Sequence, residues 1–173
     1  LSARPRPAGT GSSTAPTMPT SYDYRRRIGS FTRSAGVNVS FQQSGDLFQV
    51  TNPTTLGVAV DVTNPGTAAV TRTLNYIPTG IVVTAILNVG LELTTNRACL
   101  YLSALTTTDV AVGDEISSPM GYEIQQGVNG AMAGYRVLTN TSAQIRSRIG
   151  VSDAGTRYAI QVTAWEDRRG QDD

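Results

Sequence analysis

Three acidic residues, Asp109, Asp114 and Glu115, fall in one predicted loop, and carboxylate oxygens on a loop are the ligands that calcium prefers. Their spacing matches no EF-hand, so a solvated loop is the favoured interpretation and no metal site is predicted. Carboxylates also occur on several predicted strands, as the acid pair of a glycoside hydrolase would require. Few of them have the apolar neighbours that would raise a pKa, so a hydrolase acting on polysaccharide is only the third hypothesis.

Missing residue types exclude most other catalytic machinery. All 14 basic residues are Arg, and the chain has neither His nor Lys. This excludes a Ser-His-Asp triad, His-ligated zinc, a P-loop lysine and a Schiff base. Cys99 is the single cysteine, which excludes an internal disulfide, and its apolar neighbours predict a small buried side chain. We therefore expect no enzyme activity and no cofactor.

Aromatic and basic side chains gather where the leader joins the rest of the chain, at Tyr22, Tyr24, Arg25, Arg26 and Arg27. The simplest interpretation is a solvated charge run at the edge of a domain. A grip on a partner protein is the main functional alternative. Three arginines without a wider basic face are weak grounds for phosphate binding, so no nucleic-acid partner is predicted.

Four further residues are candidates for a subunit interface. Arg146 and Arg148 alternate with Ile145, Ser147 and Ile149, so they lie on one face of a predicted strand, and a hairpin with residues 132–139 would add Arg136 to that face. Such a row would pair with carboxylates of an adjacent subunit, or protect an edge strand from unwanted pairing. Trp165 is placed on the more polar face of the last strand, as an interface anchor or as a lid on the sandwich edge.

Length and composition predict one folded domain behind a leader. The chain has 173 residues, only 16% of them charged, with a net charge of +1. Residues 1–27 are rich in Pro, Ser, Thr, Gly and Ala, which cannot bury enough apolar surface to fold alone, so they are predicted to form an extended arm. Residues 28–173 are predicted to form the domain. No membrane span is expected, since the most apolar stretch, 81–93, is too short and is interrupted by polar residues.

Alternation with a period of two dominates the chain from residue 29 onward and predicts strands. The clearest case is 81–93, where every odd position is apolar. No window longer than about a dozen residues has helical periodicity, which indicates an all-β antiparallel sandwich; a jelly roll is preferred to a barrel. The other expected strands are 37–41, 48–50, 56–62, 70–74, 98–103, 122–124, a hairpin of 132–139 with 143–149, and 157–165.

Four segments in this order resemble small β-rich virion proteins of tailed bacteriophages, many of which carry an IPTG turn, a TNTSxQIR hairpin and a closing GWxDxRG. Here Ala164 replaces the usual Gly, and one extra Arg enters the closing motif. The likeness covers roughly residues 75–170. The segments are Ile77-Pro78-Thr79-Gly80-Ile81, Thr106-Thr107-Thr108-Asp109, Val137-Leu138-Thr139-Asn140-Thr141-Ser142-Ala143-Gln144-Ile145-Arg146 and Ala164-Trp165-Glu166-Asp167-Arg168-Arg169-Gly170.

This resemblance implies a structural role in the virion and no catalytic residues. The favoured expectation is a capsid decoration (cement) protein that stabilises a phage head through its arm and its subunit interfaces. Its partners would be further copies of the chain, a trimer being favoured, and the major capsid protein or other virion proteins. The alternative is a tail-fibre or head-fibre module that binds a receptor or glycan through loops such as 106–131.

Overall fold

The structure is a computed structural model that describes residues 28–93, 98–112, 121–124 and 130–169. These residues form twelve β-strands and one helical turn. The elements are β1 (Arg33–Ser34), β2 (Val37–Asn38), β3 (Phe41–Ser44), β4 (Leu47–Val50), α1 (Pro53–Leu56), β5 (Val60–Thr63), β6 (Val70–Thr73), β7 (Thr84–Glu92), β8 (Ala98–Ser103), β9 (Gly121–Ile124), β10 (Gly130–Leu138), β11 (Gln144–Ile149) and β12 (Arg157–Glu166).

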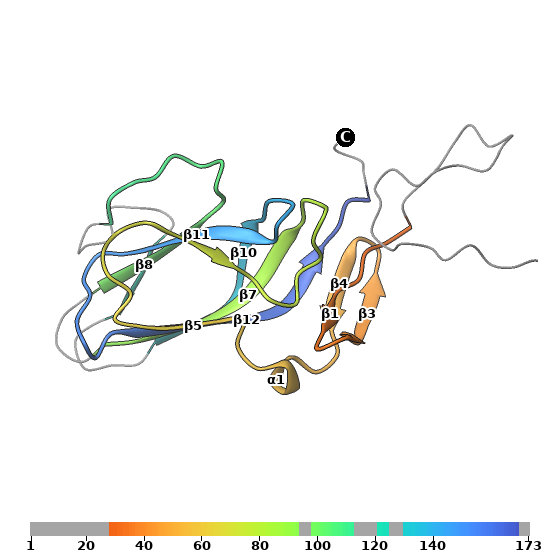
Figure 1. Ribbon diagram of the computed structural model, residues 1–173, viewed down its shortest axis with the longest axis horizontal. Coiled ribbons are helices and arrows are strands. Elements are labelled where there is room, and N and C mark those ends of the chain that lie inside the picture. The colour runs from red at the N-terminus through yellow and green to blue at the C-terminus, as the bar shows by residue number, and fades with distance from the viewer. Residues whose placement is uncertain (1–27, 94–97, 113–120, 125–129, 170–173) are drawn as a thin grey trace, which may run out of the picture.

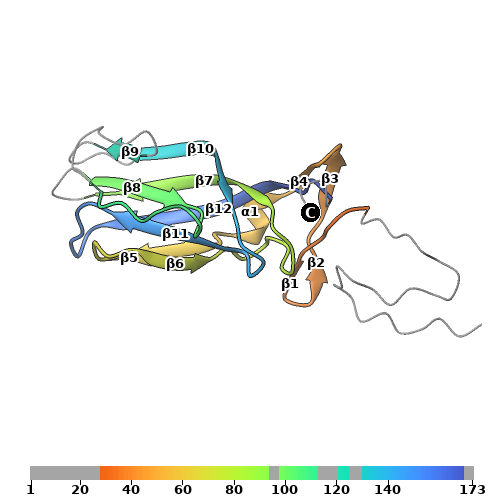
Figure 2. The same ribbon diagram turned by 90° about the horizontal axis from the view of Figure 1, so that it is seen from above.

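Two antiparallel sheets pack against each other, as Figure 1 shows. The larger sheet has the order β10-β7-β12-β4-β3. Two strands share one side of β12: β5 pairs with its first half, and β4 pairs with its last residues. The smaller sheet has the order β6-β11-β8-β9. Figure 2 shows β9 and β10 along one edge of the sandwich and β5 and β6 along the other. The predicted all-β antiparallel sandwich is confirmed.

The core lies between the sheets because each long strand is apolar on one face only. In β7 the buried positions alternate with half-buried ones from Thr84 to Leu91, and in β12 they alternate from Arg157 to Thr163. Burying a Val, Leu, Ile, Phe or Met side chain stabilises the folded state by about 1.5–3 kcal/mol relative to leaving it exposed. The core residues with no exposed surface are Ala85, Leu87, Ile145, Ile160 and Trp165.

The predicted hairpin of 132–139 with 143–149 is wrong. β10 pairs with β7 in the larger sheet, whereas β11 pairs with β6 and β8 in the smaller one. The turn between them therefore crosses from one sheet to the other and places both inward faces against the same core. Ala143 adopts a left-handed φ of 56° in this turn and is itself buried.

The predicted strand 56–62 is also wrong in its first half. Pro53 opens the single helical turn α1, a position where the fixed φ of proline fits a helix and its missing N–H costs nothing. Gly57 then ends the turn with a φ of 76°, which a residue with a Cβ rarely adopts. Only Val60–Thr63 forms a strand.

Strands β1 to β4 and α1 lie together at one end of the sandwich, and the last residues of β12 reach the same end (Figures 1 and 2). The first and last described segments of the chain are thus close to each other. Within the described residues, no helix is long and apolar enough to cross a bilayer.

Candidate docking site

The predicted interface residues divide into two groups. Tyr22, Tyr24 and the three arginines at 25–27 lie outside the described residues. Arg136, Arg146, Arg148 and Trp165 are described, and they lie in three different environments. The structure does not bring them together as one surface.

Arg146 and Arg148 hold a segment of their own chain. Both point outward from β11, and Arg146 donates hydrogen bonds to the carbonyl oxygens of Leu105 at 3.2 Å and Thr107 at 2.5 Å. Arg148 forms an ion pair with Asp109 at 2.7 Å. β11 is central in its sheet, so the interpretation that these arginines protect an edge strand is wrong. They fix residues 104–109 over the outer face of the smaller sheet, where Figure 1 shows this segment leaving β8.

Replacing both arginines with alanine is therefore expected to release residues 104–110 while the sandwich stays folded. Amide hydrogen exchange in this segment should accelerate, because the bonds that hold it to the sheet are gone, and exchange in β7 and β12 should not change. Exchange measured by mass spectrometry checks this. Arg157→Ala is the matched control, since it removes an arginine ion pair from the other sheet. Unchanged exchange in 104–110 would contradict the assignment.

Of the three acidic residues in the predicted loop, the structure describes only Asp109. Asp109 is engaged by Arg148, and the other two predicted acidic residues, Asp114 and Glu115, lie outside the described residues. Over the part of the chain that the structure describes, no three Asp, Glu, His or Cys side chains come close enough to ligate one ion.

Arg136 does not share the arginine face of β11, because β10 belongs to the opposite sheet. Its guanidinium forms an ion pair with Glu166 of β12, across the intervening strand β7 of the larger sheet. The interpretation of Arg136, Arg146 and Arg148 as one row is thus wrong. The error follows directly from the hairpin that sequence alternation suggested.

Trp165 is in the core and not on a polar face, with 0% of its surface exposed. A β-bulge at Thr163 is the reason, since Val162 pairs with Leu87 while Ala164 pairs with the next residue, Ile86. The extra residue moves the inward positions of β12 from even to odd numbers. An interface anchor must present its ring to a partner, so the buried Trp165 does not fit that interpretation.

The indole instead organises an aromatic cluster at the end of the sandwich. It stacks on Phe48 with ring centroids 5.4 Å apart, and Phe41 meets it edge-on at 5.5 Å. Its N–H donates a hydrogen bond to the hydroxyl of Ser30 at 2.9 Å. Trp165 thereby joins the last strand to the first described residues.

Three contacts hold the first described residues against the rest of the domain. Besides the bond from Trp165 to Ser30, a Cβ added to Gly29 would lie 3.3 Å from the ring of Phe48, so the backbone passes close over the aromatic cluster. The hydroxyl of Thr32 donates to the carbonyl of Ile77 at 3.5 Å. We call this arrangement of residues 29–32 the clamp.

Turns that lie far apart in the sequence are joined to one another by hydrogen bonds and an ion pair. The N–H of Gly80 donates to the carbonyl of Thr141 at 2.6 Å, which joins the turn at 77–80 to the turn at 139–143. Asn140 Oδ1 accepts the N–H groups of Ser142 and Gln144, both at 2.9 Å. In the closing segment, Arg169 pairs with Asp46 in the turn between β3 and β4. These residues position the backbone of the turns.

Two perturbed pKa values also have structural causes. Hydrogen bonds from Arg157, at 2.8 and 2.6 Å, lower the pKa of the Asp61 carboxyl on the outer face of the larger sheet. Burial raises the pKa of Tyr135, whose hydroxyl donates to the carbonyl of Leu102 in the opposite sheet.

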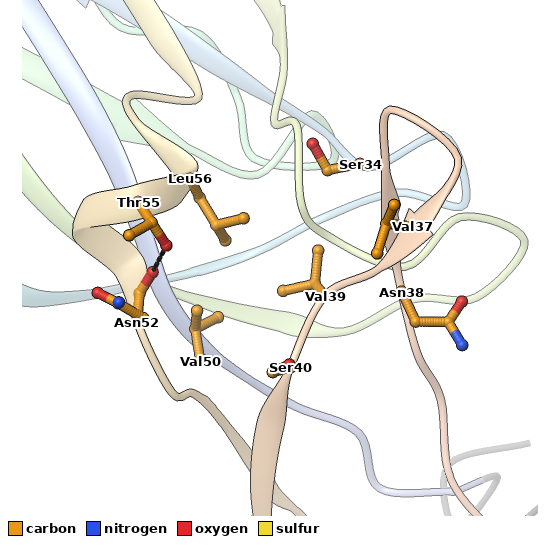
Figure 3. A pocket seen from close by; sticks show the side chains of 9 residues that line it. All are labelled: Ser34, Val37, Asn38, Val39, Ser40, Val50, Asn52, Thr55 and Leu56. Atoms are coloured by element: carbon orange, nitrogen blue, oxygen red, sulfur yellow. Dashed lines mark hydrogen bonds between the residues drawn. The ribbon is translucent and has the colours of Figure 1, made fainter.

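An open pocket lies beside the clamp, between the β1–β2 hairpin, β4 and α1 (Figure 3). Its volume is about 280 Å³. Val39, Val50 and Leu56 converge on it, and uncharged polar side chains form its rim. The lining residues are Ser34, Val37, Asn38, Val39, Ser40, Val50, Asn52, Thr55 and Leu56.

The pocket was not predicted from the sequence. Leu56 was assigned to a strand, and its position depends on α1, which brings it opposite Val39. The dipeptide Asn52-Pro53 followed by Gly57 was the available signal for that turn. Exposed apolar residues, Ile28, Phe31 and Val37, accompany the clamp and the pocket.

This end of the molecule, with its clamp and pocket, is the candidate docking site. It combines apolar surface with uncharged hydrogen-bonding groups. Comparison of the chain with protein-family models, with curated proteins and with solved structures finds no match in any of the three.

Proposed function

We propose that the chain is a virion structural protein of a tailed bacteriophage, a decoration or cement protein that stabilises the head. It binds as an oligomer, for which we propose a trimer, and contacts the major capsid protein through its arm and its subunit interfaces. The observation that carries this proposal is the clamp. It holds residues 29–32, which follow the predicted arm in the sequence, against the aromatic cluster of the core.

The clamp supports an arm that transmits force between subunits. Any pull on residue 28 passes through Gly29 and Ser30 to Trp165 in the central strand β12, and so into the largest buried side chain of the core. Arms exchanged between subunits add contact area without enlarging the core.

The strand order supports the finer assignment of a jelly roll. The strands β5, β12, β7 and β10 face β6, β11, β8 and β9, and successive strands alternate between the sheets except at β8 and β9. This is the connectivity of two interlocked Greek keys, and it is frequent in viral capsid and lectin domains. The architecture suits assembly, although a fold by itself does not fix a function.

Removal of residues 1–27 tests the proposal. Phage heads that lack this protein are incubated with the full chain or with residues 28–173, and bound protein is measured per head by quantitative gel analysis and electron microscopy. The full chain should saturate the heads, and the shortened chain should lose most of its occupancy. Equal occupancy by the two proteins would overturn the proposed role of the arm.

Two controls keep this result interpretable. Thermal unfolding followed by circular dichroism must give similar midpoints for both proteins, because the clamp begins after the deletion. A full-length chain that does not bind the heads but binds host cells or a glycan array would favour the tail-fibre alternative. Binding to neither would contradict both functions.

A further inference from the structure

The pocket beside the clamp has the composition of a site for an uncharged peptide. None of its lining residues is charged, and three apolar side chains form its floor. Small-molecule sites usually have volumes of roughly 300–1,000 Å³ and enclose their ligand. A volume of about 280 Å³ in an open pocket suits one anchoring side chain with its adjacent backbone.

The rim of the pocket carries apolar surface that the described chain leaves uncovered. Val37 is 69% exposed, although its neighbour on the same face, Val39, is 5% exposed. The strand β3 forms the edge of the larger sheet beside the pocket, and its four residues include no charge and no proline. Natural proteins usually protect an exposed edge strand with charged residues or proline. Because β3 has neither, it is suited to be covered by another segment.

The leader contains one segment that matches this pocket. Residues 7–21 carry no charge, and Met18 is the only apolar side chain larger than alanine or proline between Leu1 and Tyr22. Pro16 and Pro19 flank it and favour an extended conformation, which loses little entropy on binding. Methionine is unbranched and fills irregular apolar pockets well.

The length of the leader permits an exchange between copies. Met18 precedes Ile28 by ten residues, which span at most about 33–36 Å when extended. Ser34 lines the pocket and follows Ile28 by only six residues. The leader is therefore long enough to reach the pocket of its own chain or of a second copy, and the proposed exchange of arms between subunits favours the second copy.

We propose that this pocket binds the Ala15–Pro19 segment of a second copy of the chain, with Met18 between Val39, Val50 and Leu56. The inference rests on the proposed function in one respect, namely that the arm engages neighbouring subunits. It adds the segment of the arm that binds and the place where it binds.

Disulfide trapping between two differently tagged chains tests the exchange. One chain carries Met18→Cys and the other Val37→Cys, both in a Cys99→Ala background, and they are mixed, oxidised and separated on a non-reducing gel. A disulfide requires Cα atoms within about 7 Å, so the crosslinked heterodimer should be the main product. Val58→Cys is the matched control, because Val58 is 43% exposed but does not line the pocket, and its crosslink should be several-fold weaker.

The other outcomes overturn the proposal. A single chain with both Met18→Cys and Val37→Cys that forms only an internal disulfide would place the segment in its own pocket. Heterodimer yields that are equal for Val37→Cys and Val58→Cys would show random contact, and no crosslink at all would show an empty pocket. Purified chains suffice for these measurements, so their failure is distinguishable from failure to bind phage heads.

A second measurement avoids cysteine chemistry. Val37→Asp places a charge at the apolar rim, so the oligomer of the full chain should dissociate to a smaller mass in light scattering. Val58→Asp should retain the oligomer, since it adds the same charge outside the pocket. A retained oligomer in Val37→Asp, with the protein folded, would overturn the exchange.

Discussion

Replacement of Trp165 with alanine should lower the free energy of unfolding by about 3–5 kcal/mol, the range for deleting a large aromatic side chain from a core. Trp165 has no exposed surface, and it stacks on Phe48 at 5.4 Å. The substitution also leaves the hydroxyl of Ser30 without its indole partner. Because the clamp closes on this ring, residues 28–32 should detach at lower denaturant concentration than the rest of the sandwich.

Urea unfolding followed by far-ultraviolet circular dichroism measures this effect without relying on the fluorescence of the tryptophan that is removed. Ser30→Ala is the companion variant, because it deletes only the hydrogen bond and should cost about 1 kcal/mol. A loss of less than about 1 kcal/mol in Trp165→Ala would contradict its placement in the core.

Leu87→Ala should cost about 2–5 kcal/mol, the second largest effect that we expect. Leu87 lies in the middle of β7 with no exposed surface, opposite Tyr135 on one side and Val162 on the other. The substitution leaves a cavity that the flanking strands cannot fill, because both are held in the sheet.

Leu138→Ala on the adjacent strand β10 is the matched control for Leu87→Ala. The same atoms are removed, but Leu138 points outward and is 45% exposed, so the cost should stay within about 0.5 kcal/mol. Thermal or urea unfolding of both variants compares the two faces of the larger sheet. Equal losses would mean that the outward face is buried too, as in a stable oligomer whose interface covers Leu138.

Three described residues of the closing segment have structural roles. Trp165 fills the core, Glu166 pairs with Arg136, and Arg169 pairs with Asp46. These contacts join β12 to β10 and to the turn between β3 and β4. Substitutions in this segment are therefore expected to affect folding before they affect any binding partner.

Strand alternation predicted most of the architecture. The odd positions of 81–93 are apolar, and the buried residues of β7 are indeed odd-numbered from Ala85 to Leu91. The period survives in the sequence because one face of each strand meets the core and the other meets solvent. The all-β sandwich followed from repeating this pattern in many short segments.

Alternation does not identify the strand that a given strand pairs with. The segments 132–139 and 143–149 looked like a hairpin, because they are adjacent in sequence and each has one apolar face. Both faces cover the same core equally well when the turn crosses between sheets, and the left-handed Ala143 permits that crossing. The wrong hairpin also misplaced Arg136, Arg146 and Arg148. Their partners could not be read from the local sequence, since each partner lies 30 or more residues away.

The amino-acid sequence by itself determined the class of fold, the inward face of most strands and the lack of His, Lys and paired cysteines, because these depend on local periodicity and composition. Only the tertiary structure decided the position of Trp165, the clamp and the pocket. One bulge residue in β12 turns the following odd-numbered side chains toward the core. The pocket forms only where α1, β4 and the β1–β2 hairpin come together. Such features arise from the packing of distant segments, and no local pattern encodes them.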